Sequence, residues 1–502
     1  MRIKRFFIAI MAALFVFFAG ATLLTACNPI EEENEGATAG VVYEIRGTEA
    51  CVVGYKGTET EVRIAERYTF FLVTSIDTDA FRDCDHLTSV EIPNTVTTIG
   101  SSAFRDCDKL TSVVIPNSVT EIKESTFENC YNLTSVEIPD SVTSIGEYAF
   151  NKCKKLTSVE IPDGVTSIAN SAFRSCYNLT SVVIGDGVTS IGLGAFYYCT
   201  SLTSVVIGDG VTRITSIFDG CGSLTSLVIG ESVKTIEPNV FSGCYKLVEV
   251  VNKSTHITVA KGSLSNGYVG CYALAVYNSG DAFTSKLSND NGYIIYTNGN
   301  EKILVGYAGT ETDLVFPSYI TKINQYAFRD CDGVTSVVIG DSVTNIGNNA
   351  FYACDSLKSV VIGNSVERIG DLAFYNCDGL TSVEIPDGVT NIGNSAFRSC
   401  NNLTSVVIGN SVTSIGEHAF NNCSNLTSVE IPDSVMSIGW GVFFNCSRLT
   451  SVTFKDTSTW YTTTSSLDWE NKTGGEEISV STPSTNATYF KSTYYDYYWY
   501  KL

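Results

Sequence analysis

Hydrophobic and polar residues repeat along most of the chain with a period of 23 residues. One unit, starting at Cys130, reads CYNLTSVEIPDSVTSIGEYAFNK. Apolar and polar residues alternate over positions 133–138, and this alternation with many β-branched residues predicts a β-strand with one buried face. The Pro139-Asp140-Ser141 segment then predicts a turn, because Pro lacks an amide donor and Asp hydrogen-bonds to the backbone nearby.

The second half of the unit supplies the other wall of a core. Val142, Ile145 and the Ala149-Phe150 pair are apolar, and Gly146 lets the chain turn before the Ala-Phe-x-x-Cys corner. Burying the roughly eight apolar side chains of one unit stabilises it by about 1.5–3 kcal/mol per side chain. This is less than the conformational entropy cost of ordering the whole unit, which is about 1.5 kcal/mol per residue. The units must therefore stack into a solenoid, in which strands about 4.8 Å apart give roughly 60 Å for about twelve units.

The cysteines mark the repeat and its interruption. The cysteines at the repeat position form two sets, which are Cys84, Cys107, Cys130, Cys153, Cys176, Cys199, Cys221 and Cys244, then Cys331, Cys354, Cys377, Cys400, Cys423 and Cys446. Before each set stands the same motif, GYKGTET at 54–60 and GYAGTET at 306–312. We therefore interpret the chain as a duplication in which each repeat block begins with a similar opening module.

The sequence divides into eight predicted segments. They are a signal peptide (1–26), an acidic tether (27–40), a β opening module (41–76), a first repeat block (77–251), an irregular connector (252–290), a second β opening module (291–319), a second repeat block (320–455) and a C-terminal cap (456–502). The opening modules are expected to be small β-meanders, with Asn298-Gly299 as a hairpin turn. The connector forms either irregular rungs of one array or a hinge between two, and we favour one continuous solenoid.

The unit pattern L-x-x-V-x-I-P-x-x-V-x-x-I-G-x-x-A-F-x-x-C resembles the BspA-like leucine-rich repeat family, the treponemal-type class of such repeats. The resemblance covers most of residues 77–455. It implies a β-rich, right-handed solenoid with a parallel β-sheet face. Members of this family are typically bacterial cell-surface proteins, and several are adhesins for host matrix proteins or other bacteria. The resemblance therefore implies a surface binding role without naming the ligand.

The N-terminus predicts export. Arg2, Lys4 and Arg5 precede an apolar run over 6–20, and Leu24-Thr25-Ala26-Cys27 follows. Small residues before a Cys at the end of an apolar run match a bacterial lipoprotein signal, so Cys27 is the predicted lipidation site and the lipid is the predicted membrane anchor. The alternatives are an ordinary signal peptide or a membrane helix. We expect the protein at the bacterial cell surface or outer membrane.

The composition excludes several functions. With 32 Lys+Arg against 53 Asp+Glu the formal charge is −21, which argues against nucleic-acid binding, because few phosphate counterions would be released. Three His and three Met make a His-rich metal site or haem site improbable. The chain lacks C-x-x-C, H-E-x-x-H, G-x-S-x-G and phosphate-loop patterns, so we expect no catalysis and no cofactor.

The outward positions of the first predicted strand carry Thr, Ser and one variable residue. This variable column provides the candidate protein-binding face, which consists of Glu137, Glu160, Val183, Val206, Val228, Val338 and Val361. Exposed apolar patches usually mark contacts with a partner, which favours the Val183–Val206–Val228 group as a binding surface. The alternative is that Val occurs there only because it suits strands.

Two further columns have competing interpretations. Asp140, Asp163 and Asp186 stand at successive turns, where they either form a carboxylate ladder for Ca²⁺ or make Asx turns, and we favour turns. The repeat cysteines could bridge neighbouring rungs, but parallel Cβ vectors keep the Cβ atoms near 4.8 Å, longer than the usual ~3.8 Å. We therefore expect buried, reduced thiols that act as small hydrophobes.

The C-terminal tail is strongly aromatic, with Tyr497 and Trp499 as candidate residues for stacking on a sugar. The alternative is an edge strand that closes the solenoid.

Together with the family resemblance, these features predict an adhesin that binds a host extracellular-matrix protein or another surface protein. A glycan-binding module and a surface-coat protein without a specific ligand are the alternatives.

Overall fold

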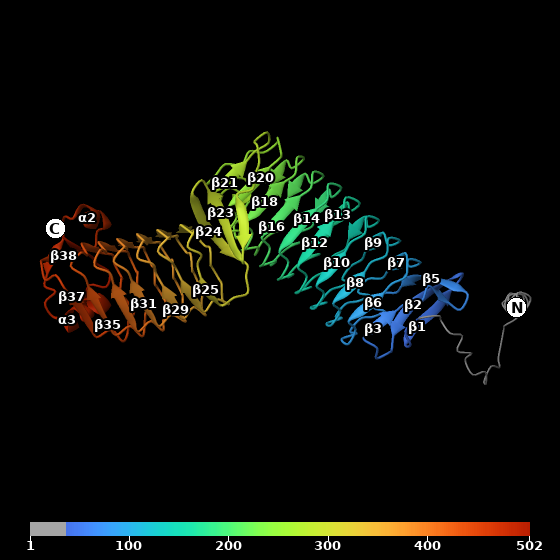
Figure 1. Cartoon of the computed structure of the whole chain (residues 1–502), viewed down its shortest axis with the longest axis horizontal. Coiled ribbons are helices and arrows are strands. Elements are labelled where there is room, and N and C mark those ends of the chain that lie inside the picture. The colour runs from blue at the N-terminus through green and yellow to red at the C-terminus, as the bar shows by residue number, and fades with distance from the viewer. Residues whose placement is uncertain (1–36) are drawn as a thin grey trace, which may run out of the picture.

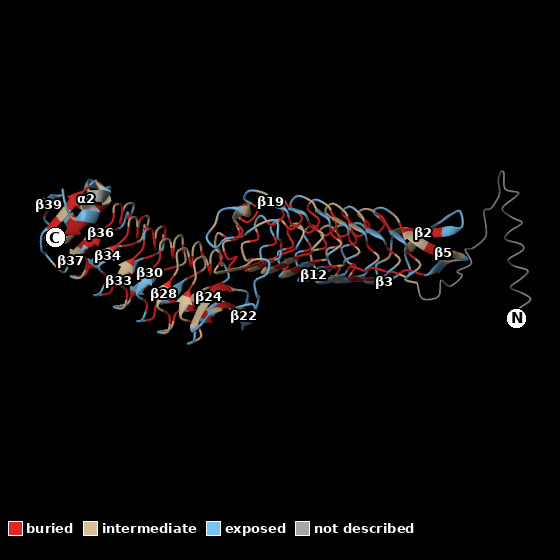
Figure 2. Ribbon diagram, turned by 90° about the horizontal axis from the view of Figure 1, so that it is seen from above, coloured by how far each residue is buried: buried red, intermediate tan, exposed pale blue. Residues whose placement is uncertain are grey.

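The computed structural model describes residues 37–502 as two rows of stacked rungs. The first row runs from the blue N-terminal end to the green centre, and the second runs from yellow to the red C-terminal end at an angle to the first (Figure 1). Buried residues line the inside of each row and exposed residues its outside (Figure 2). The predicted solenoid of 23-residue units is confirmed, because strands in neighbouring rungs pair in parallel at this spacing, as in Val182 with Val205.

Each rung of the first block contributes a longer strand to one sheet and a two-residue strand to another. The long-strand face comprises β3 (Glu61–Arg63), β6 (Ser89–Glu91), β8 (Ser112–Val114), β10 (Ser135–Glu137), β12 (Ser158–Ile161), β14 (Ser181–Ile184), β16 (Ser204–Ile207), β18 (Ser226–Ile229), β20 (Glu249–Asn252) and β21 (Ala275–Tyr277). The short-strand face comprises β7 (Thr98–Ile99), β9 (Glu121–Ile122), β11 (Ser144–Ile145), β13 (Ser167–Ile168), β15 (Ser190–Ile191), β17 (Arg213–Ile214) and β19 (Thr235–Ile236).

The second block repeats this plan. Its long-strand face comprises β25 (Asp313–Val315), β27 (Ser336–Val338), β29 (Ser359–Val361), β31 (Ser382–Ile385), β33 (Ser405–Ile408), β35 (Ser428–Ile431) and β37 (Ser451–Phe454). Its short-strand face comprises β26 (Lys322–Ile323), β28 (Asn345–Ile346), β30 (Arg368–Ile369), β32 (Asn391–Ile392), β34 (Ser414–Ile415) and β36 (Ser437–Ile438). The Ala-Phe-x-x-Cys segment, which we call the arm, closes the third side of each rung.

The two opening modules differ. The first contains β1 (Val41–Arg46), β2 (Glu49–Tyr55), β4 (Arg67–Tyr68) and β5 (Phe71–Ile76); β1 and β2 form an antiparallel hairpin, but β2 pairs with β5 in parallel. The second is an antiparallel meander of β22 (Leu287–Asp290), β23 (Tyr293–Asn298) and β24 (Glu301–Tyr307). Both modules then continue into the short-strand face, through β5–β7 and β24–β26.

Hydrogen bonds and stacked rings hold each rung to the next. In the arms, the Phe127 amide donates to the Ala149 carbonyl of the following rung at 2.8 Å. On the long-strand face, the Thr134 hydroxyl donates to the Thr111 carbonyl of the preceding rung at 3.1 Å. Within the core, one buried Phe per rung stacks on the next, with ring centroids 5.0 Å apart for Phe150 and Phe173. Most of the stability of a rung therefore comes from its neighbours.

The expectation of one continuous solenoid is wrong. The first core ends at Ala273, inside the connector, which also holds a 3-10 turn η1 (Asn266–Tyr268), and a separate core begins at Tyr293. Strand β23 is buried on both faces, because Tyr293 and Ile295 face the second core while Ile294 and Tyr296 pack against the end of the first block in a small third cluster. The meander therefore lies against the first block and starts a new sheet.

The C-terminal cap ends the second core. It contains β38 (Trp460–Thr463), α2 (Ser466–Asn471), β39 (Glu476–Ile478), α3 (Pro483–Thr488), the π-helical turn η2 (Tyr489–Thr493) and β40 (Tyr498–Lys501). Strand β40 pairs antiparallel with β36 and with β38, so it extends the short-strand face by reversing its direction. Trp460, Trp499 and Tyr500 are fully buried in this cap.

Candidate functional site

The outer face of the first long-strand sheet brings the predicted valines together. The register places Val183, Val206 and Val228 in one column on adjacent strands, with Glu160 beside Val183. Glu137 is exposed on the preceding rung, so acidic side chains flank one end of the valine column.

The exposure of this column falls towards the junction of the two blocks. Val183 is 42% exposed, Val206 and Val228 are half-buried, and Val251 on the next strand is buried. Residues 306–310, which comprise the end of β24 and the three residues after it, face the rungs of Thr180 and Thr203 across a cavity. We attribute the declining exposure to this approach of the second block, which leaves only part of the predicted patch open.

A more exposed apolar column lies on the long-strand face of the second block. We call Val315, Val338 and Val361 the valine stripe; they lie side by side on β25, β27 and β29. Their exposed fractions are 68%, 37% and 57%, while their neighbours Val337 and Ile339 point into the core. Val315 was not predicted as part of a binding face, because residues 291–319 were assigned to an opening module, although the Asp-Leu-Val-Phe alternation at 313–316 is visible in the sequence.

The short-strand face of the same block carries different side chains at its outward positions. The residues there are polar or charged, namely Lys322, Asn345, Arg368, Asn391 and Ser414. Both faces are built of strands, but the outward column of the long-strand face is valine on β25, β27 and β29 and mixed on the later strands, with Glu384, Val407 and Glu430, so strand propensity alone does not account for three adjacent valines. The difference favours the interpretation of the valine stripe as a contact surface.

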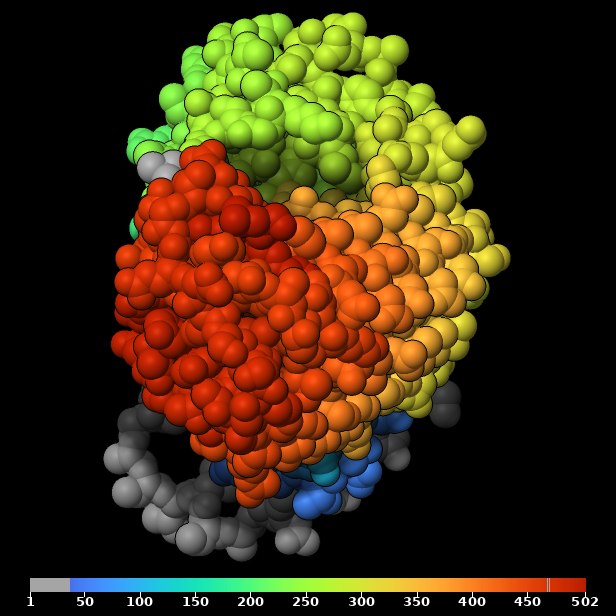
Figure 3. All heavy atoms as spheres, turned by 90° about the vertical axis from the view of Figure 1, so that its left-hand side faces the viewer, coloured from blue at the N-terminus to red at the C-terminus, as the bar shows by residue number. Residues whose placement is uncertain are grey.

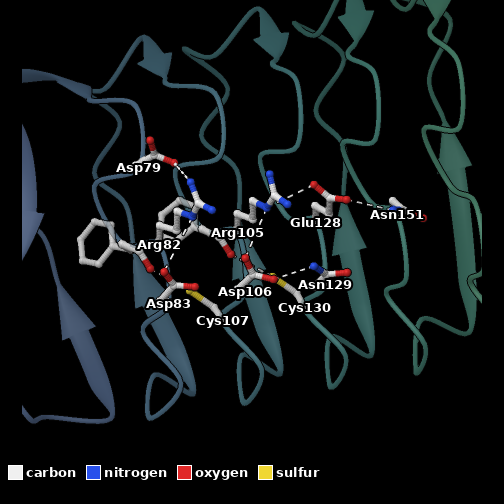
Figure 4. A network of polar contacts seen from close by, with 12 residues as sticks. Asp79, Arg82, Asp83, Arg105, Asp106, Cys107, Glu128, Asn129, Cys130 and Asn151 are labelled. Atoms are coloured by element: carbon white, nitrogen blue, oxygen red, sulfur yellow. Dashed lines mark hydrogen bonds and ion pairs between the residues drawn. The ribbon is translucent and has the colours of Figure 1, made fainter.

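The arms of the first block carry a network of polar side chains along their outer edge (Figure 4). Arg105 lies 3.3 Å from both Asp106 and Glu128, and the Asn151 amide donates to Glu128 at 3.0 Å. The Arg105–Glu128 and Asn151–Glu128 contacts each join one rung to the next, so they stabilise the stack, whereas the Arg105–Asp106 pair lies within one rung. No cluster of His, Cys, Asp and Glu that could hold a metal occurs among residues 37–502.

The turn carboxylates bond between rungs. Asp163 accepts a hydrogen bond from the Asp186 amide at 2.8 Å, and Asp186 accepts one from the Asp209 amide at 2.9 Å. Each carboxylate thus caps the turn of the following rung rather than its own. A Ca²⁺ ion bound along this ladder would compete with these hydrogen bonds.

In the part of the chain that the structure describes, the repeat cysteines are free thiols, all of them buried except the half-buried Cys331. The Cys176 thiol donates to the Phe150 carbonyl at 3.2 Å, and the other repeat thiols make equivalent contacts along most of both blocks. Desolvation raises the pKa of Cys176 and of Cys400 to about 12. The packing role that the sequence suggested fits this arrangement.

We therefore expect the repeat thiols to react with a thiol reagent only after unfolding. At pH 8 little thiolate forms at a pKa near 12, whereas an unfolded Cys with a pKa near 8.5 reacts readily. Labelling of the native and denatured protein followed by peptide mass spectrometry measures this, with the half-buried Cys271 of the connector as an internal reference. If few free thiols were found after denaturation, the repeat cysteines would be joined in disulfides rather than reduced.

The glycan-stacking hypothesis for the tail is wrong for Trp499. Its ring is fully buried and packs on Phe490 with centroids 4.3 Å apart, so neither face is open to a sugar. Tyr497 is half-buried and lies edge-to-face with Tyr494 at 5.1 Å. The tail therefore closes the second core, which was the alternative interpretation of its aromatic residues.

The predicted lipidation site, Cys27, lies outside the residues that the structure describes. Between residues 37 and 502, no helix combines the length and the apolar character that crossing a membrane requires. The predicted anchor therefore stays a prediction.

Comparisons with known proteins identify relatives by sequence and by structure. A family model described as "BspA type Leucine rich repeat region (6 copies)" matches residues 74–192, 166–269, 307–423 and 344–467. Among curated proteins, none matches the chain.

Several solved structures are similar. A leucine rich cell surface protein from Faecalibacterium prausnitzii is 24% identical, covering 92% of this chain and 100% of its own, with a TM-score of 0.33. A leucine-rich repeat protein from Bacteroides ovatus is 26% identical, covering 83% and 94%, with a TM-score of 0.35. A leucine-rich repeat protein of T. pallidum is 27% identical, covering 41% and 87%, with a TM-score of 0.31.

Proposed function

Because this chain belongs to the BspA type leucine-rich repeat family, whose members are cell-surface proteins, we propose that it is an adhesin. It binds a protein of a host or of another microbe through the outer face of its second block, and the lipid on Cys27 holds it at the bacterial surface. Leucine-rich repeat solenoids are typically protein-interaction scaffolds, and the proposal includes no catalytic step.

The valine stripe is the observation that supports this proposal. Val315, Val338 and Val361 present adjacent apolar side chains on strands about 4.8 Å apart. Soluble surfaces rarely expose such contiguous apolar groups without a contact to make. Hydroxyl groups border the stripe, and Asp313 accepts hydrogen bonds from Thr335 and Ser336 at 2.7 and 2.6 Å, which orients a polar rim.

We expect the double variant Val338→Asp/Val361→Asp to lose ligand binding at least about tenfold, which corresponds to ~1.4 kcal/mol. Two carboxylates in the stripe would have to be desolvated when a partner covers them. A soluble fragment covering 37–502, tested against arrays of host matrix proteins and bacterial surface proteins, supplies the measurement. Circular dichroism should remain unchanged, because both side chains point away from the core.

Two controls separate the stripe from a general effect of charge. Val114→Asp adds a carboxylate at the same repeat position of the first block, where the side chain is 67% exposed, and should leave binding intact. Val338→Thr/Val361→Thr retains the β-branched shape and should weaken binding less than the aspartates. If the Val338→Asp/Val361→Asp variant still bound the ligand, the valine stripe would be excluded as the binding surface. If the parent protein bound no protein on any array, a surface-coat role would be favoured.

A further inference from the structure

Two adjoining cavities form a groove where the blocks meet. They measure about 530 Å³ and about 400 Å³ and share Lys246 and Ser223 in their linings. The first block supplies one wall, and residues 306–310 with the arm of Arg329 supply the other. Viewed from the C-terminal end, the surface is hollowed where the green first block rises above the orange second block (Figure 3).

Glycine replaces larger residues of the repeat at this groove. The positions on either side of the repeat cysteine carry large residues elsewhere, such as Lys152 and Lys154. At the groove these positions become Gly220, Gly222 and Gly243. A Cβ atom at Gly220 would meet the ring of Tyr198 at 2.6 Å. At Gly220 this ring fills the space, whereas a Cβ atom at Gly222 or Gly243 would meet nothing nearer than 3.9 Å, so these two glycines leave space for a ligand of the size that small-molecule sites accept.

Lys246 is the unusual residue of the groove. It takes the corner position that Asn178, Ser201 and Ser223 occupy on the preceding rungs. Only 6% of the residue is exposed, and its ammonium makes no hydrogen bond or ion pair with any residue in 37–502. The ammonium belongs to a residue that lines both cavities, so a ligand carboxylate in the groove would give it the acceptor that the protein does not supply.

The rest of the larger cavity is polar and aromatic. Arg329 lies over the rings of Tyr245 and Tyr352, at 4.3 and 4.6 Å from their centroids, and pairs with Asp330 at 3.1 Å. The remaining lining consists of hydroxyls, one further carboxylate, glycines and Tyr198: Thr200, Asp219, Gly220, Gly222, Ser223 and Gly243. The absence of any aliphatic side chain from this lining disfavours an apolar peptide side chain and favours a ligand rich in hydroxyl groups.

We propose that the groove binds an acidic pyranose, a hexuronic or sialic acid residue of a glycan. The carboxylate of the sugar pairs with the Lys246 ammonium, its hydroxyls bond to Ser223, Thr200 and Asp219, and its apolar ring face lies against Tyr198, whose ring is partly exposed. Arg329 is held in place by its two tyrosines and donates to a ring substituent. This site is separate from the valine stripe and does not depend on the proposed protein ligand.

Titration of the 37–502 fragment with free sugars tests the proposal. Glucuronic acid and 3′-sialyllactose are the probes, with glucose and lactose as neutral counterparts, and ligand-observed NMR or calorimetry measures binding. We expect saturable binding of an acidic sugar and at least about tenfold weaker binding of its neutral counterpart. Glucuronic acid alone would indicate a hexuronic acid site, and sialyllactose alone a sialic acid site.

Two lysine variants carry the test further. Lys246→Met keeps the length of the side chain and should weaken acidic-sugar binding at least about tenfold, with an unfolding midpoint at or above that of the parent, because an unpaired buried charge is removed. Lys155→Met is the matched control: Lys155 has the same repeat position but is exposed, so sugar binding should not change.

Three results of the sugar titrations would overturn the proposal. They are no binding of either acidic sugar, equal binding of acidic and neutral sugars, and wild-type affinity in Lys246→Met. An acidic peptide that binds the parent as tightly as the sugars and loses affinity in Lys246→Met would also overturn it, by making the groove a peptide site. None of these outcomes bears on the valine stripe, which the protein arrays test separately.

Discussion

Replacing Phe150 with alanine is expected to destabilise the first block by about 3–5 kcal/mol and to leave the second block unchanged. Phe150 is fully buried, and the rings of Phe127 and Phe173 stack on its two sides at 5.3 and 5.0 Å. Truncation would leave a cavity that faces both neighbouring rungs. In a solenoid each rung depends on its two interfaces, so both would weaken together.

The two separate cores predict that unfolding has two transitions. Phe374 holds the equivalent position in the second block, between Phe351 and Phe397 at 5.0 and 5.1 Å. Phe374→Ala should therefore lower the second transition and spare the first. Denaturant titration followed by hydrogen exchange and mass spectrometry assigns each transition to a block.

Phe70→Ala is the control for these variants, because its ring is 65% exposed and its loss should change stability by no more than about 0.5 kcal/mol. If Phe150→Ala and Phe374→Ala shifted a single transition equally, the junction would couple the blocks into one cooperative unit. The account of two independent cores would then be wrong.

The repeat itself was predictable because one physical pattern recurs in every rung. Alternation at 133–138 fixes which side chains enter the core, and a period of 23 places the same residues in register on the next rung. The valine stripe follows from the same register. Its one member that was not predicted, Val315, shows that the opening module of the second block already contributes a full strand to the long-strand face.

The junction was not predictable from the repeat. Residues 252–290 are off-period, so nothing in their pattern shows that the meander after them lies against the side of the first block. For the same reason the partial burial of Val206 and Val228 could not be foreseen. Lys246 looks like an ordinary corner residue in the sequence, and only the approach of residues 306–310 buries it. Contacts between blocks depend on geometry that periodicity does not encode.

The second large effect is expected at Glu249, which ties the connector to the first block. Glu249 is fully buried at a strand position where the preceding rung has Ser226. Its carboxylate accepts hydrogen bonds from the Ser285 hydroxyl at 2.7 Å and from the Lys286 amide at 2.9 Å. These bonds hold the segment that leads into β22, and therefore the start of the second block.

We expect Glu249→Ser to release this segment, although it restores the residue of the repeat. A serine hydroxyl is too short to reach Ser285 and Lys286, so two hydrogen bonds to a charged acceptor, each worth about 1.5–3 kcal/mol, would be lost. A loss of about 3 kcal/mol in local stability corresponds to roughly a hundredfold faster amide exchange at 285–287. Small-angle scattering should show a broader range of angles between the blocks.

Glu249→Gln separates the charge from the shape of the side chain. Glutamine keeps one carbonyl acceptor at the same place, so exchange at 285–287 should accelerate less than in Glu249→Ser. Glu231→Ser removes an exposed glutamate from the same block and should leave exchange unchanged. Unaltered exchange and scattering in Glu249→Ser would mean that the third hydrophobic cluster, with Val248 and Ile294, fixes the junction without help from the carboxylate. The angle between the blocks would then be a property of apolar packing alone.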